Sequence, residues 1–134
     1  YFEDTGLLIG SLDEETQEDL RNNENMNTYK GALYKNIIGD MLVKAGYQLY
    51  FYKDDSKKIE MDFMIRDKQS LIPVEVKAND NATISLNNLI NNNLYKDIKY
   101  GIKLCNKNIG FNGKFYTFPY FLTFLLKRFL EEKK

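Results

Sequence analysis

Two stretches in the middle of the chain alternate between apolar and polar residues. They are Ile59–Arg66 and Leu71–Lys77, and the polar residues 67–70 lie between them. Alternation with a period of two, interrupted by a short polar turn, is typical of two paired β-strands. The pattern therefore predicts an antiparallel hairpin with a four-residue loop.

The loop length decides which residues of this hairpin face each other. One side then holds only apolar pairs, which are Ile65 with Ile72, Phe63 with Val74 and Met61 with Val76. A shift of one residue would turn one strand's apolar side chains to the wrong face. On the other side, Asp62 faces Glu75 and Glu60 faces Lys77. The predicted register thus gathers three acids and a lysine.

Facing carboxylates repel each other, and a cation between them removes the conflict. Mg²⁺ takes oxygen ligands, usually including one or two carboxylates. Asp62 and Glu75 are therefore candidate metal ligands, and the Lys77 ammonium could orient a metal-bound water or offset charge on a scissile phosphate. The alternative is a surface hairpin in which Glu60 and Lys77 form a weak exposed salt bridge, because charged residues are common on a strand's open face.

The remaining pattern predicts helices and strands on both sides of the hairpin. Thr28 is a candidate N-cap for a long helix that Gly46 ends, and Asn112-Gly113 is a type I′ turn signal. The predicted elements are helix Tyr29–Ala45, strand Tyr47–Lys53, helix Thr83–Asn92, strand Lys99–Cys105, a hairpin between Asn108–Phe111 and Lys114–Phe118, and helix Pro119–Glu132. A right-handed β-helix-β crossover should link Leu71–Lys77 to the strand at Lys99–Cys105.

Both ends of the chain carry further expectations. Residues 1–12 suggest a short strand or loop, Asp13 is a candidate N-cap for one or two helical turns, and Asn22–Asn27 is a candidate flexible boundary. We expect the last helix to pack on the sheet, with surplus apolar surface meeting another domain or another copy of the chain. Its predicted apolar face consists of Phe121, Leu122, Leu125 and Phe129.

Charge divides the chain into two parts although its net charge is zero. Residues 1–27 contain eight acids and one base, Arg21, whereas residues 28–134 contain eleven acids and eighteen bases, a net charge of +7. A basic core behind an acidic leader is compatible with nucleic-acid binding. Ordinary solubility charge in a lysine-rich protein is the alternative explanation.

Several classes of function are excluded by what the sequence lacks. The 134 residues contain no histidine, which removes histidine-based triads and ordinary zinc sites. There is no G-x-x-x-x-G-K-[ST] loop for ATP hydrolysis, and no apolar run approaches the roughly 20 residues that span a bilayer. The single Cys105 cannot form an internal disulfide, which fits a cytoplasmic protein.

The charged pattern also resembles a known motif. Glu60-x-Asp62 followed by Glu75-x-Lys77 resembles the PD-(D/E)XK nuclease motif. The stretches YFEDTGLL, GALYKNIIGDML and LIPVEVKA resemble the C-terminal domain of unknown function of many bacterial and archaeal AAA-type ATPases. This resemblance covers nearly the whole chain. It implies an α/β fold with a restriction-endonuclease-like core, a mixed central sheet flanked by helices, at residues 28–134, and an acidic leader at 1–27 packed on or linking to it.

The resemblance also implies roles for particular residues. Asp62, Glu75 and the main-chain carbonyl of Val76 would bind Mg²⁺ or Mn²⁺, Lys77 would position the attacking water, and Glu60 would lie just behind them. ATP would bind only in a preceding region of the parent chain. The family often has an acid on its first helix in a G-x-x-x-E pattern, but counting from Gly31 the residue here is Lys35.

The functional interpretations depend on the role of Lys35. It could neutralise the carboxylates and leave a site that needs no metal, and Asp40 lies about 140° further round the helix, too far to replace the missing acid. We therefore expect a non-catalytic or weakly active nuclease-like module that binds nucleic acid or protein. Metal-dependent phosphodiester hydrolysis and a purely structural domain are the alternatives.

Overall fold

Six strands form one mixed sheet in the computed structural model, which describes residues 4–22, 26–68, 70–79 and 82–133. Across the sheet their order is β1-β2-β3-β4-β6-β5. The strands are β1 Tyr50–Asp54, β2 Ile59–Asp67, β3 Ser70–Val76, β4 Gly101–Cys105, β5 Gly110–Phe111 and β6 Phe115–Pro119. The predicted α/β class with a mixed central sheet is therefore confirmed.

The sheet combines an antiparallel half with a parallel centre. β1, β2 and β3 pair antiparallel, β3, β4 and β6 pair parallel, and β5 returns antiparallel at the edge beside β6. The helix α4, Ile84–Ile90, connects β3 to β4. The predicted β-helix-β link between these neighbouring strands is thus confirmed.

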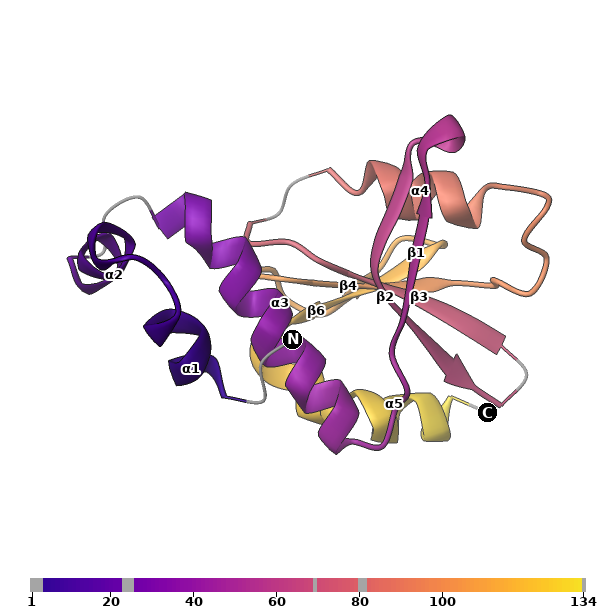
Figure 1. Cartoon of the computed structure of the whole chain (residues 1–134). Coiled ribbons are helices and arrows are strands. Elements are labelled where there is room, and N and C mark those ends of the chain that lie inside the picture. Colours follow the sequence, from indigo (N-terminus) through magenta and orange to yellow (C-terminus); the bar gives the residue numbers. More distant parts are fainter. Residues whose placement is uncertain (1–3, 23–25, 69, 80–81, 134) are drawn as a thin grey trace.

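Helices cover both faces of the sheet (Figure 1). The long α3, Met26–Lys44, and the C-terminal α5, Leu126–Glu132, lie on one face, and α4 lies on the other. Two short helices, α1 Thr5–Gly10 and α2 Glu14–Arg21, pack beside α3 on its side away from the sheet. None of the helices in the described part of the chain is long and apolar enough to cross a membrane.

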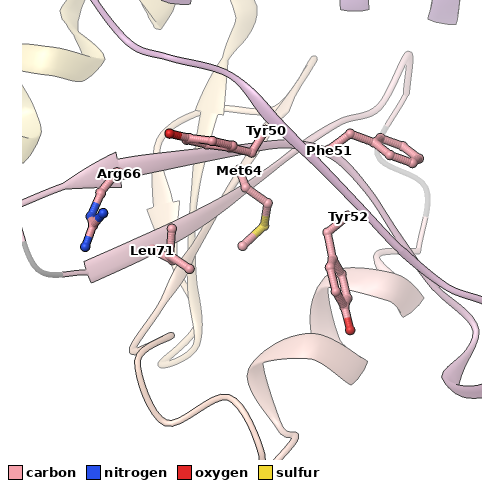
Figure 2. A pocket seen from close by; sticks show the side chains of 6 residues that line it. All are labelled: Tyr50, Phe51, Tyr52, Met64, Arg66 and Leu71. Atoms are coloured by element: carbon pink, nitrogen blue, oxygen red, sulfur yellow. The ribbon is translucent and has the colours of Figure 1, made fainter.

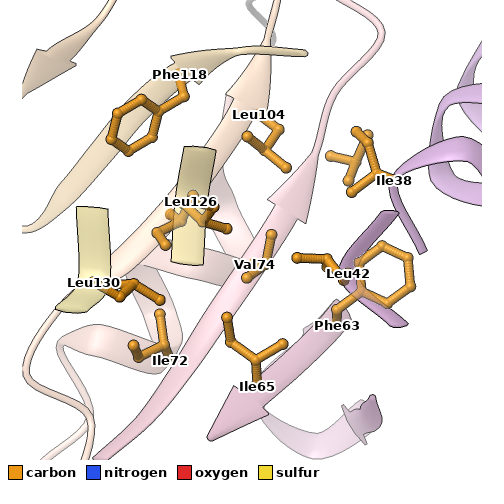
Figure 3. Close-up of a cluster of buried hydrophobic side chains, with 12 residues drawn as sticks. Ile38, Leu42, Phe63, Ile65, Ile72, Val74, Leu104, Phe118, Leu126 and Leu130 are labelled. Atoms are coloured by element: carbon orange, nitrogen blue, oxygen red, sulfur yellow. The ribbon is translucent and has the colours of Figure 1, made fainter. Parts of the chain in front are cut away.

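The core consists of two clusters, one on each face of the sheet. Figure 3 shows the larger one, where side chains from α3 and α5 meet the strands. The larger cluster is Ile38, Leu42, Phe63, Ile65, Ile72, Val74, Val76, Ile102, Leu104, Phe118, Leu126 and Leu130. The smaller cluster, under α4, is Ile59, Met61, Met64, Leu86, Leu89, Ile98 and Phe115.

A β-bulge in β2 changes the predicted hairpin. The register with β3 agrees with the prediction from Phe63 opposite Val74 to Arg66 opposite Leu71, and it extends to Asp67 opposite Ser70. Against β1, however, Tyr50 pairs with Met64 and Tyr52 with Met61, so β2 holds one extra residue. Such a bulge reverses the side-chain alternation.

The reversal moves Met61 to the opposite face of the sheet from Phe63. Met61 lies in the smaller cluster and Phe63 in the larger one. The predicted pairs of Met61 with Val76, Asp62 with Glu75 and Glu60 with Lys77 are therefore wrong, because they assumed an unbroken alternation along the strand.

The two ends of α3 differ in how well they were predicted. Its C-terminus has the expected form, since Gly46 has φ +91°, its N–H donates to the Val43 carbonyl, and the Tyr47 N–H donates to the Leu42 carbonyl. These two bonds form a Schellman cap. The helix begins at Met26, so Thr28 lies inside it and is not its N-cap. Residues 23–25 of the predicted flexible boundary lie outside the described residues.

The C-terminal segment is not one α-helix. Pro119 ends β6, a 3₁₀ helix η2 spans Tyr120–Leu125, and α5 follows. Because a 3₁₀ helix turns every three residues, the predicted apolar face is displaced. Phe121 is 71% exposed, and Leu126 and Leu130 are buried in its place.

Three smaller predictions were tested at turns and at the N-terminus. Asp13 caps α2 by accepting from the Thr16 N–H, as expected, but the predicted strand or loop before it contains helix α1. Between β1 and β2, the chain forms a second short 3₁₀ helix, η1, at Asp55–Lys57. The hairpin β5–β6 is present, but Gly113 has the positive φ there and Asn112 does not, so the turn is not type I′.

Candidate functional site

The candidate site lies where β3 ends beside the bulge of β2 and the middle of α3. The bulge sets Asp62 next to β3, and the parallel neighbour β4 continues beside it. Polar side chains from these elements meet here, namely Lys35, Asp62, Glu75, Lys77 and Lys103. The structure thus brings together three of the predicted site residues, Asp62, Glu75 and Lys77.

Both oxygens of the Asp62 carboxylate are engaged. Its Oδ1 lies 2.6 Å from the Lys35 Nζ, and its Oδ2 accepts the Val76 N–H at 2.8 Å. The Asp62 side chain is only 12% exposed. The expected neutralisation by Lys35 therefore has a close ion-pair geometry.

The Glu75 carboxylate is buried more deeply, and one of its oxygens lacks a partner. Its Oε1 lies 2.9 Å from the Lys77 Nζ, and the residue is 3% exposed. Among the described residues, nothing forms a hydrogen bond with the buried Oε2. Burial raises the pKa of Glu75, and the hydrogen bond from Lys77 opposes that rise.

Glu60 and Val76 are the two other residues predicted for the site. Glu60 is exposed and pairs in register with Lys53 on β1, so it does not lie behind the other carboxylates. Val76 is 3% exposed, and its N–H is the donor to Asp62. The role predicted for its carbonyl stays a prediction.

The residues do not fit a divalent cation in this arrangement. Across residues 4–22, 26–68, 70–79 and 82–133, no three acidic or cysteine side chains gather in a group that could hold a metal ion. Two carboxylates are present, but an ammonium lies within 3 Å of each, at 2.6 Å from Asp62 and 2.9 Å from Glu75. A lysine at this distance occupies the position and supplies the charge that a metal would supply.

Sequence reasoning missed three residues of the site. The Tyr120 hydroxyl donates to the Lys77 carbonyl, and its ring stacks on Tyr34 with 4.2 Å between ring centroids. Burial raises the pKa of Tyr120. The third residue, Lys103, is 5% exposed in β4. A lysine inside an otherwise apolar strand was a signal for Lys103, but nothing local marks the tyrosines.

A separate apolar pocket lies at the β1 edge of the sheet. It has a volume of about 370 Å³ and is lined by residues of β1, β2 and β3 (Figure 2). Tyr50 and Phe51 are 46% and 63% exposed there, and Arg66 is the one charged residue in the lining. This lining is mostly aromatic and aliphatic, and it contains no carboxylate and no cysteine.

Comparison with known proteins gives one match. The sequence model of a family described as "Domain of unknown function (DUF4143)" matches residues 30–121. That segment runs from α3 into η2 and includes the whole sheet and the ion-paired carboxylates. No curated protein and no solved structure matches the chain.

Proposed function

The chain belongs to the DUF4143 family of domains of unknown function, and from that premise we propose that it is a nuclease-like module that binds nucleic acid without cleaving it. In this proposal its core is restriction-endonuclease-like and is attached to an AAA-type ATPase. The Glu75-x-Lys77 sequence at the end of β3, beside a mixed sheet covered by helices on both faces, supports that assignment.

The observation that carries the proposal is the Lys35–Asp62 ion pair. The 2.6 Å contact places a fixed positive charge where a metal-dependent nuclease needs a divalent cation. Without the cation, the site lacks the group that activates water in a metal-dependent nuclease. Binding can persist in such a site, because attraction of phosphates needs only positive charge.

The charge distribution favours nucleic acid as the ligand. The net charge of +7 over residues 28–134 is carried by the part of the chain that forms the sheet and its covering helices. Lysine ammonium groups attract phosphates regardless of sequence, so we expect non-specific and salt-dependent binding.

The experiment is a calorimetric titration of Mn²⁺ into the native chain and into Lys35→Glu. We expect no binding by the native chain, whereas Lys35→Glu replaces the ammonium by a third carboxylate and gains a Mn²⁺ site. Lys30→Glu is the matched control, since it makes the same charge change on α3 five positions earlier. It should not bind Mn²⁺.

Nucleic-acid binding is measured in parallel with fluorescently labelled DNA in the presence of a chelator. The proposal predicts binding to native chain without metal and no cleavage after Mn²⁺ is added. Absence of DNA binding at low salt would remove nucleic acid as the ligand.

Metal-dependent phosphodiester hydrolysis is the second candidate function. The buried Glu75 Oε2 favours it, because an acceptor without a partner is a place for a ligand. If the native chain bound Mn²⁺, and Asp62→Ala abolished that binding, this candidate would replace the non-cleaving module.

A further inference from the structure

We propose that a pocket between β4, β5, β6 and the loop after β4 binds a phosphate-type anion. The pocket has a volume of about 320 Å³. The lining residues that matter here are Lys103, Lys107, Asn108, Asn112 and Thr117. Neither Asp62 nor Glu75 lines the pocket, although Lys103 of the lining lies beside Glu75 in the sheet.

Charge around the pocket favours an anion. Its lining includes two lysines and no acidic residue. Lys103 sits between Glu75 and Thr117 in the register of the sheet and is 5% exposed. Its charge and that of Lys77 both act on the Glu75 carboxylate. Within the lining itself, Lys103 and Lys107 are the charged residues.

Two asparagines of the lining are held by hydrogen bonds from the backbone to their side-chain oxygens. The Asn112 Oδ1 accepts the Lys114 N–H at 3.0 Å and the Phe115 N–H at 2.9 Å, and the Asn108 Oδ1 accepts the Ile109 N–H at 2.8 Å. Only the oxygen of an amide side chain can accept a hydrogen bond, so these backbone N–H groups fix the orientation of each amide, with its NH₂ group away from them. The NH₂ end of each asparagine is therefore the end that remains for a ligand.

Ammonium groups, amide NH₂ groups and a hydroxyl together suit the oxygens of a phosphate. A nucleic-acid phosphodiester and a free phosphate present the same oxygens, so the ligand is named by that chemistry. The inference rests on the proposed function in one respect, namely that the phosphate in the pocket belongs to a nucleic acid. In that function, the pocket gives nucleic acid a point of attachment away from the neutralised carboxylates.

The test uses inorganic phosphate and a single-stranded DNA oligonucleotide as probes of the full chain, followed by amide NMR. Phosphate should shift the amide signals of residues 107–113. Lys107→Gln should weaken phosphate binding about fivefold or more, since it removes a charge-assisted contact. Asn108→Asp should abolish it by placing a carboxylate in the lining. Lys107 and Asn108 are exposed, so both variants should keep the fold.

Lys114→Gln is the matched control, because Lys114 lies in the same hairpin but outside the pocket. Its phosphate affinity should stay near that of the native chain. If Lys114→Gln weakened phosphate binding as much as Lys107→Gln, or if phosphate shifted amide signals over the whole surface, the proposed phosphate site in this pocket would be wrong.

The oligonucleotide separates this inference from the proposed function. Competition between oligonucleotide and phosphate at residues 107–113 supports both. Phosphate binding in the pocket without any oligonucleotide binding supports the pocket and removes the nucleic-acid function. Oligonucleotide binding that Lys107→Gln leaves unchanged, with no phosphate shifts in the pocket, overturns the pocket and leaves the function standing.

Discussion

Glu75 holds a carboxylate in the interior of the protein, with one oxygen paired and the other without a hydrogen-bond partner among the described residues. Burial raises its pKa and outweighs the lowering by Lys77 and Lys103, while Asp62 adds to the rise. The charged form is therefore less stable in the folded protein than in the unfolded chain. Ionisation of Glu75 destabilises the fold.

This imbalance predicts a pH dependence. The window runs from pH 4.5, the ordinary pKa of a glutamate, up to the raised pKa of Glu75. Within it, the folded state binds more protons than the unfolded state. The free energy of unfolding should therefore fall as pH rises through this window, and the loss persists above it. Glu75→Gln should lack this contribution. Urea denaturation of both proteins from about pH 4 to 8 measures it.

The difference in unfolding free energy between the two proteins is the informative quantity, because other titrating groups are common to both. A difference that is independent of pH would contradict the assigned effect of burial. Lys77→Gln serves as a companion variant, since removing the opposing hydrogen bond should steepen the same dependence.

Individual residues of the site were predictable where they depended on the local pattern of the sequence. The proximity of Glu75 and Lys77 follows from their places on one strand, and Lys35 was singled out by its position after Gly31. The bulge at Asp62 was not predictable, because it depends on how β1 pairs with β2 across the sheet. Lys103 joins the site through the parallel pairing of β3 and β4, which local periodicity does not contain.

At the scale of elements, the contact between α4 and the sheet depends on the lack of a side chain at Gly101. A Cβ there would lie 2.6 Å from the Leu86 Cδ1 and 3.1 Å from the Ile90 Cδ1. Leu86 is fully buried, so it has no free space to move into. The first residue of β4 thus sets how closely α4 approaches.

Gly101→Ala should therefore lower the free energy of unfolding by about 1–3 kcal/mol through overpacking. Gly31→Ala is the matched comparison. Apart from its chain neighbours and the backbone of its own helix, no heavy atom of the described residues lies within 4 Å of a Cβ built there, and the site is inside α3. Alanine should stabilise that helix by roughly 0.5–1 kcal/mol. Urea denaturation measures both changes, and a stable Gly101→Ala would mean that α4 can shift outward at little cost.

Elements whose apolar residues recur with one clear period along the sequence were predicted well. Elements whose sequence is compatible with more than one helical period were not. The strands of the central hairpin and the helix before Gly46 carry strong patterns. The segment after Pro119 is apolar on all sides, so its sequence does not specify whether η2 turns every three or every 3.6 residues. Packing on α3 and the sheet decides this, with Thr123 and Leu126 inside.

The charge asymmetry belongs to the scale of the whole molecule. Four of the leader's eight acids, Glu14, Glu15, Glu18 and Asp19, belong to α2, which lies against α3, the helix that also provides Lys35. Their negative charge acts against any polyanion that approaches the basic core. The leader should therefore weaken nucleic-acid binding.

Removing residues 1–25 takes away eight acids and one base and raises the net charge from zero to +7. If the proposed function holds, the shortened chain should bind DNA about three- to tenfold more tightly at low salt, and the gain should shrink as salt screens it. Fluorescence anisotropy over a salt series measures the change, with circular dichroism to verify the fold.

A second variant distinguishes an effect of the leader's charge from an effect of the leader covering the binding surface. It keeps the leader but neutralises α2 by Glu14→Gln, Glu15→Gln, Glu18→Gln and Asp19→Asn. An electrostatic effect requires that this variant also binds more tightly. Affinity that stays constant in both proteins would show that the leader does not act on the ligand.

The position of β6 has a consequence for synthesis on the ribosome. β6 lies between β4 and β5, although it follows both in the chain. Until residues 115–119 have emerged, β4 has an open side that can pair with another nascent chain. Leu126 and Leu130 of the larger core cluster emerge later still. The core therefore closes only after residue 130 has left the ribosome, and a message truncated before this region would release a chain prone to aggregation.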